Sequence, residues 1–526
     1  MRSRLSRAVA LAGGFTALAL AAMPLANASP LNASPLAANR QAVNVSAPGR
    51  ALAPGTRFFV PRPPAGSVAQ IKQLASEGGT ADALLVAEMV TTPQAVWFDG
   101  TTPSGAQQTP VQVAEAVHRT MIEAALEDAV PVLVMYNIPG RDCAQYSAGG
   151  ATSDQSYQDW ATGFAKGLGN GQAVVIVEPD SLANDPSSCP PGSYSNWPTP
   201  PTDTSRFADI AFDVKTLEAD DPNASVYLDA GHSAWVNVGE IAYRLVQSDV
   251  GQAQGFFLDV SNYQYTQNNV FYGNWVSDCI TYITQVDPSA GDSETDANNA
   301  CPNQYWNGGP DTNWTGTALS PYGVWQDISL TTWDSYTAQQ QAAALPTDAG
   351  GLNSNYANLL NGAAPITHYV IDTSRNGQGP NDMATYAGAP YDQTSNIISN
   401  LQSGNWCNPP DSGLGLPPTA DPAADTSIVE DSLLDAFLWV KTPGQSDGQC
   451  DLAGAVRNWD DSAYTPPNIP NWPQPTSPTF NTFDPLWSLD TGTVFTDPAA
   501  GAWFPQQALQ LAQRANPPLS PLPTAG

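Results

Sequence analysis

Lysine, histidine and basic charge as a whole are scarce in this chain of 526 residues. There are four lysines (Lys72, Lys166, Lys215 and Lys441) and three histidines, and 18 Lys and Arg stand against 49 Asp and Glu, for a net charge of −31. Nucleic acids and anionic membrane surfaces repel such a chain, so we exclude both as partners. The three histidines are also too scattered to form a zinc site, and we expect no metal.

Two further absences narrow the class of protein. No G-x-G-x-x-G or phosphate loop follows the early apolar runs, which counts against nucleotide binding, and we expect no cofactor. Beyond the N-terminus, no apolar run approaches the length of a membrane helix. Residues 1–28 combine three arginines, an apolar run and a small-x-small end, which is the pattern of a secretory signal peptide. We therefore predict a secreted, extracellular protein with a flexible leader at 29–52 and a tail at 520–526.

Six cysteines in an exported chain predict three disulfides. They are Cys143, Cys189, Cys279, Cys301, Cys407 and Cys450. Six cysteines allow many pairings, and their spacing alone does not choose among them. Sequence neighbours would pair as 143 with 189, 279 with 301 and 407 with 450.

Strand-like and helix-like segments alternate along the chain from about residue 53. Apolar runs that predict strands occupy 94–98, 131–136, 173–178, 225–229, 255–260, 367–372 and 433–440. Helical patterns lie between most of them, for example at 111–129 and 206–220. Such alternation indicates an α/β protein with a parallel sheet, either open or closed into a barrel.

Polar side chains at the ends of these runs favour the barrel. Charged or amide residues stand at or just after the carboxyl end of each predicted strand, as Glu178 and Asp180 do after the run at 173–178. A β/α barrel builds its active site from all the loops at that face, whereas a doubly wound sheet uses one switch point. Two long segments, 266–352 and 442–502, interrupt the alternation and are expected to cover this face.

Two signatures at strand ends resemble those of family 6 glycoside hydrolases. They are "YNIPGRDC" (136–143) and "VIVEPDSLA" (175–183), and further matches follow in family order at "VWFDG" (96–100), "VYLDAGHSAW" (226–235), "DVSNY" (259–263), "IDTSRNG" (371–377), "GNWCN" (404–408), "DAFLWVKTPGQSDG" (435–448) and "GAWF" (501–504). The resemblance covers 53–519, which we predict to be one catalytic domain. It implies a distorted, seven-stranded parallel β/α barrel of the TIM-barrel type. It also supports disulfides Cys143–Cys189 and Cys407–Cys450.

Carboxylic acids carry the chemistry that this resemblance implies. Cleaving a glycosidic bond needs one protonated carboxyl group for the leaving oxygen and activation of a water on the opposite face. By resemblance, Asp180 is the general acid, Asp142 supports its protonation and the proton relay, and Asp447 is the carboxylate proposed as base. Tyr136 crowds the distorted sugar, and Arg141 completes the first signature. Without the signatures, acids at strand ends would be read as helix caps or salt bridges.

The resemblance also implies residues that bind substrate. Trp97, Trp235 and Trp406 match aromatic platforms for sugar rings, with core packing as the alternative for each. Polar contacts are expected from Asp99, His232, Asn262, Lys441 and Gln445. Gln445 stands where the family commonly has glutamate, which removes one charge beside the sugar.

The expected function is a monomeric, secreted, inverting β-1,4-glucan (cellulose) hydrolase, and its partner is the glucan chain. We favour cellobiohydrolase over endoglucanase action, because the segments 266–352 and 442–502 are long enough to roof a groove. The alternatives are an endo-β-1,4-glucanase on soluble or mixed-linkage glucans and a catalytically weak glucan-binding protein.

Overall fold

A computed structural model describes residues 51–519 except 196, 198, 309–315, 425–432, 451–456 and 474–481. The predicted signal peptide, the leader up to residue 50 and the tail lie outside the described residues. No helix in the described part is long and apolar enough to cross a membrane.

Seven parallel strands form one sheet, hydrogen-bonded in chain order from β1 to β7. Their bounds are β1 Val96–Phe98, β2 Val132–Met135, β3 Ala173–Val177, β4 Ala224–Asp229, β5 Gly255–Leu258, β6 His368–Asp372 and β7 Leu434–Leu438. The amide of Ala95 donates to the carbonyl of Trp439 at 2.9 Å, so the two edges of the curled sheet meet beside β1 and β7. The predicted strands and the distorted barrel are confirmed.

Alternation along the strands divides the core into two layers. Side chains such as Val134, Ile176, Tyr227 and Phe257 fill the interior of the barrel, whereas their neighbours in the same strands pack outward under the helices. Strands that are buried on both faces account for the continuous apolar runs in the sequence. Leu52, at the end of the predicted leader, is also buried in the interior cluster.

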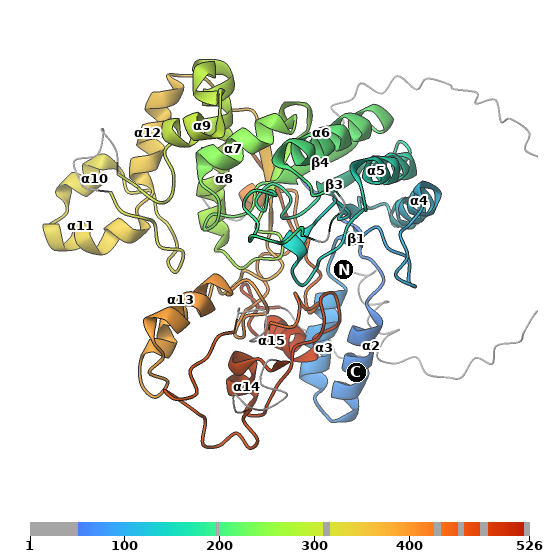
Figure 1. Ribbon diagram of the computed structural model, residues 1–526, viewed down its shortest axis with the longest axis vertical. Coiled ribbons are helices and arrows are strands. Elements are labelled where there is room, and N and C mark those ends of the chain that lie inside the picture. The colour runs from blue at the N-terminus through green and yellow to red at the C-terminus, as the bar shows by residue number, and fades with distance from the viewer. Residues whose placement is uncertain are drawn as a thin grey trace, which may run out of the picture.

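Fourteen α-helices are described around this sheet. They are α2 Ala65–Ser76, α3 Thr80–Val90, α4 Pro110–Leu126, α5 Asp154–Leu168, α6 Asp203–Asp220, α7 Val238–Gln247, α8 Thr266–Thr281, α9 Glu294–Ala300, α10 Leu330–Ser335, α11 Ala338–Ala344, α12 Gly350–Leu360, α13 Ser395–Ser403, α14 Pro485–Thr491 and α15 Pro505–Gln513. In Figure 1, α4 to α9 lie with the sheet in the upper part of the molecule, and α13 to α15 lie below with α2 and α3.

Candidate active site

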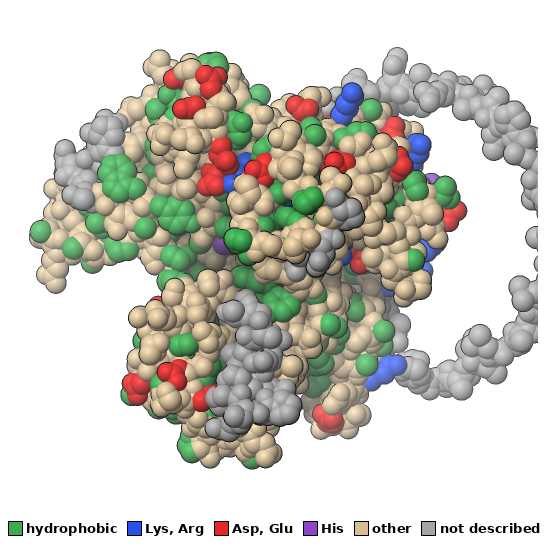
Figure 2. Space-filling view, viewed as in Figure 1, with side chains coloured by type: hydrophobic (Ala, Val, Ile, Leu, Met, Phe, Trp, Pro, Cys, Tyr) green, Lys and Arg blue, Asp and Glu red, His purple; other side chains and the backbone are tan. Residues whose placement is uncertain are grey.

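A cavity of about 1140 Å³ opens at the carboxyl ends of the strands. Its lining comprises Trp97, Tyr136, Asp142, Gln145, Ser147, Asp180, Asn184, His232, Ala234, Trp235, Ser261, Asn262, Tyr263, Gln264, Pro321, Tyr322, Pro380, Ala387, Ser395, Ile398, Ser399, Gln402, Ser403, Asn405, Trp406, Lys441 and Asp447. The surface is hollowed between the upper and lower parts of the molecule in Figure 2. Loops from every strand except β1 contribute, with Trp97 of β1 itself, as a β/α barrel site requires.

Ten of the thirteen candidate site residues line this cavity, and three do not. Asp99 is exposed, and its carboxylate accepts hydrogen bonds from the amide and hydroxyl of Thr101. Gln445 lines a separate pocket of about 230 Å³ that borders Trp97. Arg141 donates to backbone carbonyls of Asp99, Tyr136 and Ser147, and its guanidinium lies 4.6 Å from the centre of the Tyr136 ring. It therefore fixes the loop after β2 from outside the cavity.

The loop after β2 is built around a buried acid. Glu178 is fully buried, and its carboxylate accepts the amides of Asn137 and Ile138 at 2.8 and 2.9 Å. Asp142 follows with a φ of 56°, in the left-handed region, where an Asp side chain is tolerated better than most. The next residue, Cys143, is also left-handed and is tied to Cys189 by a disulfide. These restraints hold the Asp142 carboxyl group at the cavity wall.

A second buried acid supports the turn that carries Asp180. Asp229, at the end of β4, accepts the amides of Leu182 and Ala183 at 2.9 and 2.8 Å. Arg206 of α6 then joins the two loops, because it donates to the carbonyl of Ser181 at 2.8 Å and to that of Pro139 at 2.9 Å. Both loops are thus positioned by the side chains of Glu178, Asp229 and Arg206, which are not part of the cavity lining.

Burial and neighbouring carboxylates raise the pKa of two carboxyl groups in this cavity above the usual range. Burial, followed by the Asp229 and Asp142 carboxylates, raises the pKa of Asp180 well above its ordinary value. Burial likewise raises the pKa of Asp142 to about 6, against the amide of Ser147 and the charge of Arg141. The expected repulsion between Asp142 and Asp180 is present, and Asp229 adds a stronger one that the sequence analysis did not assign.

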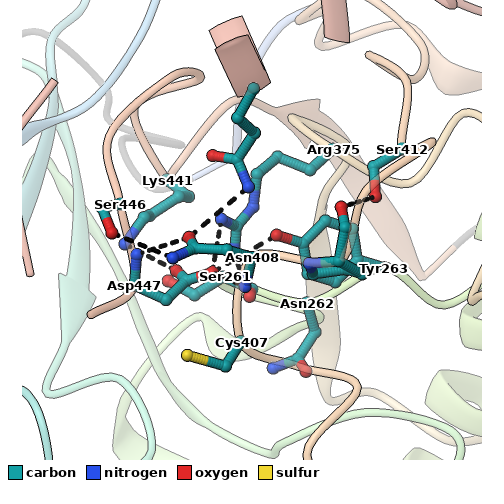
Figure 3. Close-up of polar contacts among 12 residues, drawn as sticks. Ser261, Asn262, Tyr263, Arg375, Cys407, Asn408, Ser412, Lys441, Ser446 and Asp447 are labelled. Carbon is teal, nitrogen blue, oxygen red and sulfur yellow. Dashed lines mark hydrogen bonds and ion pairs between the residues drawn. The ribbon is translucent and has the colours of Figure 1, made fainter. Parts of the chain in front are cut away.

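Asp447 has the opposite environment. Its carboxylate is paired with Arg375 at 2.9 Å and with Lys441 at 2.9 Å, and it accepts the Asn408 amide at 3.0 Å and the Tyr263 hydroxyl at 3.3 Å. Figure 3 shows Arg375, Lys441 and Asn408 converging on this carboxylate. Although burial raises it, the two cations lower the pKa of Asp447 to about 2. Asp447 is therefore ionised at any working pH.

Three partners of Asp447 were missed in the sequence. Arg375 was visible after a predicted strand, but nothing in the pattern linked it to a residue 72 positions away. Tyr263 and Asn408 lie inside the matched motifs "DVSNY" and "GNWCN". Charge complementarity was the available signal, because a buried carboxylate needs cations and donors around it.

The other candidate residues present rings and neutral donors to the cavity. Trp97 donates its indole N–H to the carbonyl of Val440 at 2.8 Å and packs edge-on against Tyr136, with ring centres 5.2 Å apart. Burial lowers the pKa of His232 to about 3, so its ring is neutral. Its Nδ1 accepts the Ala234 amide at 3.2 Å, which places the ring proton on Nε2.

The residues that line the cavity differ from those that were expected to roof it. Pro321 and Tyr322 of the segment 266–352 line it, but Asp447 is the only described residue beyond 441 that does. The facing wall is formed by Pro380 to Trp406, including α13. Residues of 442–502, such as Trp459 and Trp472, instead pack behind that wall in one apolar cluster with Leu401. The expectation that 442–502 roofs the groove is therefore wrong for the described residues, because its apolar side chains are used to support α13.

The three disulfides join sequence neighbours: Cys143–Cys189, Cys279–Cys301 and Cys407–Cys450. The first and third hold the loops of Asp142 and Asp447. One group with a metal-like spacing exists among the described residues, formed by Cys450, Asp484 and Asp497. Cys450 is disulfide-bonded and Arg457 pairs with Asp484 at 3.1 Å, so this group does not suit a cation.

Carboxyl groups with raised pKa values, in an aromatic-lined cavity at the carboxyl ends of a parallel barrel, define the site of a glycoside hydrolase. The sequence model of glycosyl hydrolases family 6 matches residues 53–515, and the chain belongs to this family.

Proteins named as endoglucanases and proteins named as cellobiohydrolases are both similar to this chain. Endoglucanase 1 of Streptomyces halstedii is 28% identical over 377 residues, which is 72% of this chain and 77% of that protein. The 1,4-beta-D-glucan cellobiohydrolase C of Emericella nidulans is 25% identical over 407 residues, 73% of this chain and 61% of that protein. Other relatives are longer, and the chain spans about half of their length. The catalytic core of the cellobiohydrolase Cel6A from Chaetomium thermophilum has the same fold, with a TM-score of 0.50 at 20% identity over 88% of this chain and 98% of that one.

Proposed function

We propose that this protein is a secreted hydrolase of β-1,4-glucan chains such as cellulose, acting by single displacement with inversion. The observation that carries the proposal is the pairing in one cavity of two carboxyl groups with raised pKa, Asp142 and Asp180, with an ionised third, Asp447. The family supplies the reaction class, and the relatives named above supply the substrate.

Asp180 is the proposed general acid. A carboxyl group can donate to the leaving oxygen only if it still holds its proton at working pH, and burial beside Asp229 and Asp142 favours the protonated form. Asp142 accepts the proton that the attacking water loses in this scheme, because its pKa of about 6 lies close to working pH. Asp447, held by two cations, is a weak base and a strong anchor, so we assign it the role of fixing Lys441 at the sugar.

The sugar rings are proposed to stack on Trp97, Trp235 and Trp406. All three are half-buried in the cavity lining, where the flat apolar face of a pyranose meets an aromatic ring. His232 and Asn262 provide neutral polar groups beside them. A mostly uncharged binding surface suits a neutral polysaccharide.

We propose endo-acting cleavage in preference to release of cellobiose from chain ends. The preference for the latter depended on 266–352 and 442–502 as a roof. The first segment supplies Pro321 and Tyr322 to the lining, but among the described residues the second supplies only Asp447. Endoglucanase 1 of Streptomyces halstedii, which is matched over 77% of its own length, is also named as an endo-acting enzyme. Loss of viscosity relative to reducing ends formed on carboxymethyl cellulose tests the mode, and a slow viscosity loss with cellobiose as the main product would contradict it.

The reaction itself is tested with cellohexaose followed by NMR during the first turnovers. We expect α-anomeric product from the β-linked substrate, since water attacks directly from the face opposite the leaving group. Initial β-anomer would indicate a covalent intermediate and overturn the proposed mechanism. No hydrolysis of any β-glucan would leave the glucan-binding protein as the better description.

A further inference from the structure

Two adjacent aromatic side chains lie exposed outside the cavity. Tyr305 is 44% exposed and Trp306 is 51% exposed, and they are the aromatic members of the exposed large apolar residues in the described part of the chain. They belong to the connection between α9 and α10, within the segment 266–352 that the family motifs do not cover. In Figure 1, α9 and α10, which flank this connection, lie with α7 and α8 in the upper left part of the molecule.

The connection is attached to the rim of the cavity. The hydroxyl of Tyr305 donates to the carbonyl of Trp235 at 2.8 Å, and the ring of Trp235 lines the cavity. The preceding residue, Gln304, is 1% exposed and donates to the carbonyl of Val236 at 2.8 Å. The exposed pair is therefore attached to the backbone of a residue that lines the cavity.

The turn that carries the pair is rigidly built. Asn307 is fully buried and donates to the carbonyls of Leu345 and Asp348 at 2.7 and 2.9 Å. The Trp306 ring rests on backbone, because a Cβ at Gly308 or Gly316 would come within 2.7 or 2.8 Å of it. A ring supported in this way and half exposed is a preformed flat surface, which needs little ordering when a ligand stacks on it.

We propose that Tyr305 and Trp306 form an outer subsite for a β-1,4-glucan chain that continues beyond Trp235. This inference rests on the proposed function. A neutral polysaccharide is the occupant we commit to, because Tyr305 is hydrogen-bonded to the cavity-lining residue Trp235 and the pair offers flat rings for pyranose faces. Substrates long enough to reach the pair gain binding there, and short ones do not. The subsite gives the segment 266–352 a role in selecting chain length.

The test compares cellohexaose with cellotriose for Trp306→Ala, and the matched control is Leu126→Ala, which truncates an 82% exposed apolar side chain on α4. We expect the ratio of kcat/KM on cellohexaose to that on cellotriose to fall about 2- to 10-fold in Trp306→Ala, the range of one aromatic contact. The ratio should be unchanged in Leu126→Ala. An unchanged ratio in a folded Trp306→Ala variant overturns the subsite, whereas a wild-type enzyme inactive on both sugars overturns the proposed function instead.

A second measurement does not depend on truncating Trp306. Oxidative footprinting of the Asp180→Asn variant should show Trp306 and Tyr305 protected by cellohexaose and not by cellobiose. Equal oxidation of Trp306 with and without cellohexaose, at concentrations that protect Trp235, would refute the proposal.

Discussion

Neutralising Asp447 should destabilise the protein by an amount that the structure sets. The two cations shift the pKa of this carboxyl from 3.8 to about 2. At roughly 1.4 kcal/mol for each pKa unit, the ionised form is favoured in the folded state by about 2–3 kcal/mol. Asp447→Asn resembles the protonated form, so we expect a loss of about 2–3 kcal/mol. Asp447→Ala also leaves the fully buried Arg375 without its carboxylate partner, and we expect a loss of about 3–5 kcal/mol.

Urea unfolding at pH 7, followed by tryptophan fluorescence, measures this loss. The matched control is Asp484→Asn, because Asp484 and Arg457 form another fully buried ion pair that lies outside the cavity lining. Both variants should lose stability, but only Asp447→Asn should lower cellohexaose turnover per folded molecule.

The pH dependence of wild-type stability tests the direction of this effect. Since the pKa of Asp447 is depressed, its stabilising contribution is present above pH 4 and is lost as the pH falls towards 2. A urea midpoint of Asp447→Asn equal to that of the wild type would refute the ion-pair reasoning. So would a wild-type stability that does not change between pH 4 and pH 2 once the contributions of other carboxylates are subtracted.

Four other outcomes are expected. Asp180→Asn should lower kcat on cellohexaose by about 10²- to 10⁴-fold, with a smaller loss on substrates with good leaving groups, and near-normal turnover would refute the acid assignment. Asp142→Asn removes a charge that raises the pKa of Asp180, so the basic limb of the kcat/KM profile should move to lower pH; an unmoved limb would show that the two groups are uncoupled. Burial raises the pKa of Asp209 to about 7 and that of Asp221 to about 6, so the folded state holds extra protons between pH 4 and 7, and Tm should fall as pH rises through this range. Arg206→Lys keeps the charge but loses the forked guanidinium that joins the two loops, so kcat should fall more than KM changes. A kcat equal to that of the wild type in a folded variant would show that the loops keep their positions without Arg206.

Local patterns predicted the elements of the barrel well. The seven apolar runs became seven strands, and the helical pattern at 206–220 became α6 at Asp203–Asp220. Strand residues are buried on both faces here, and continuous apolar runs are the direct consequence of that burial. The placement of 442–502 was wrong for the described residues, because length and aromatic content do not tell whether a segment faces a cavity or another loop.

The sequence alone determined which polar residues follow each strand and the signatures that place the chain in family 6. It also determined the thirteen candidate residues, ten of which line the cavity. These depend on neighbours in sequence and on the shared edge of parallel strands. Tertiary structure alone decided how each acid is protonated, because burial and charges from distant segments set a pKa. Asp229 beside Asp180 favours the protonated form of that carboxyl group, whereas Arg375 and Lys441 keep Asp447 ionised. The same residue type therefore holds its proton at one position and is ionised at the other.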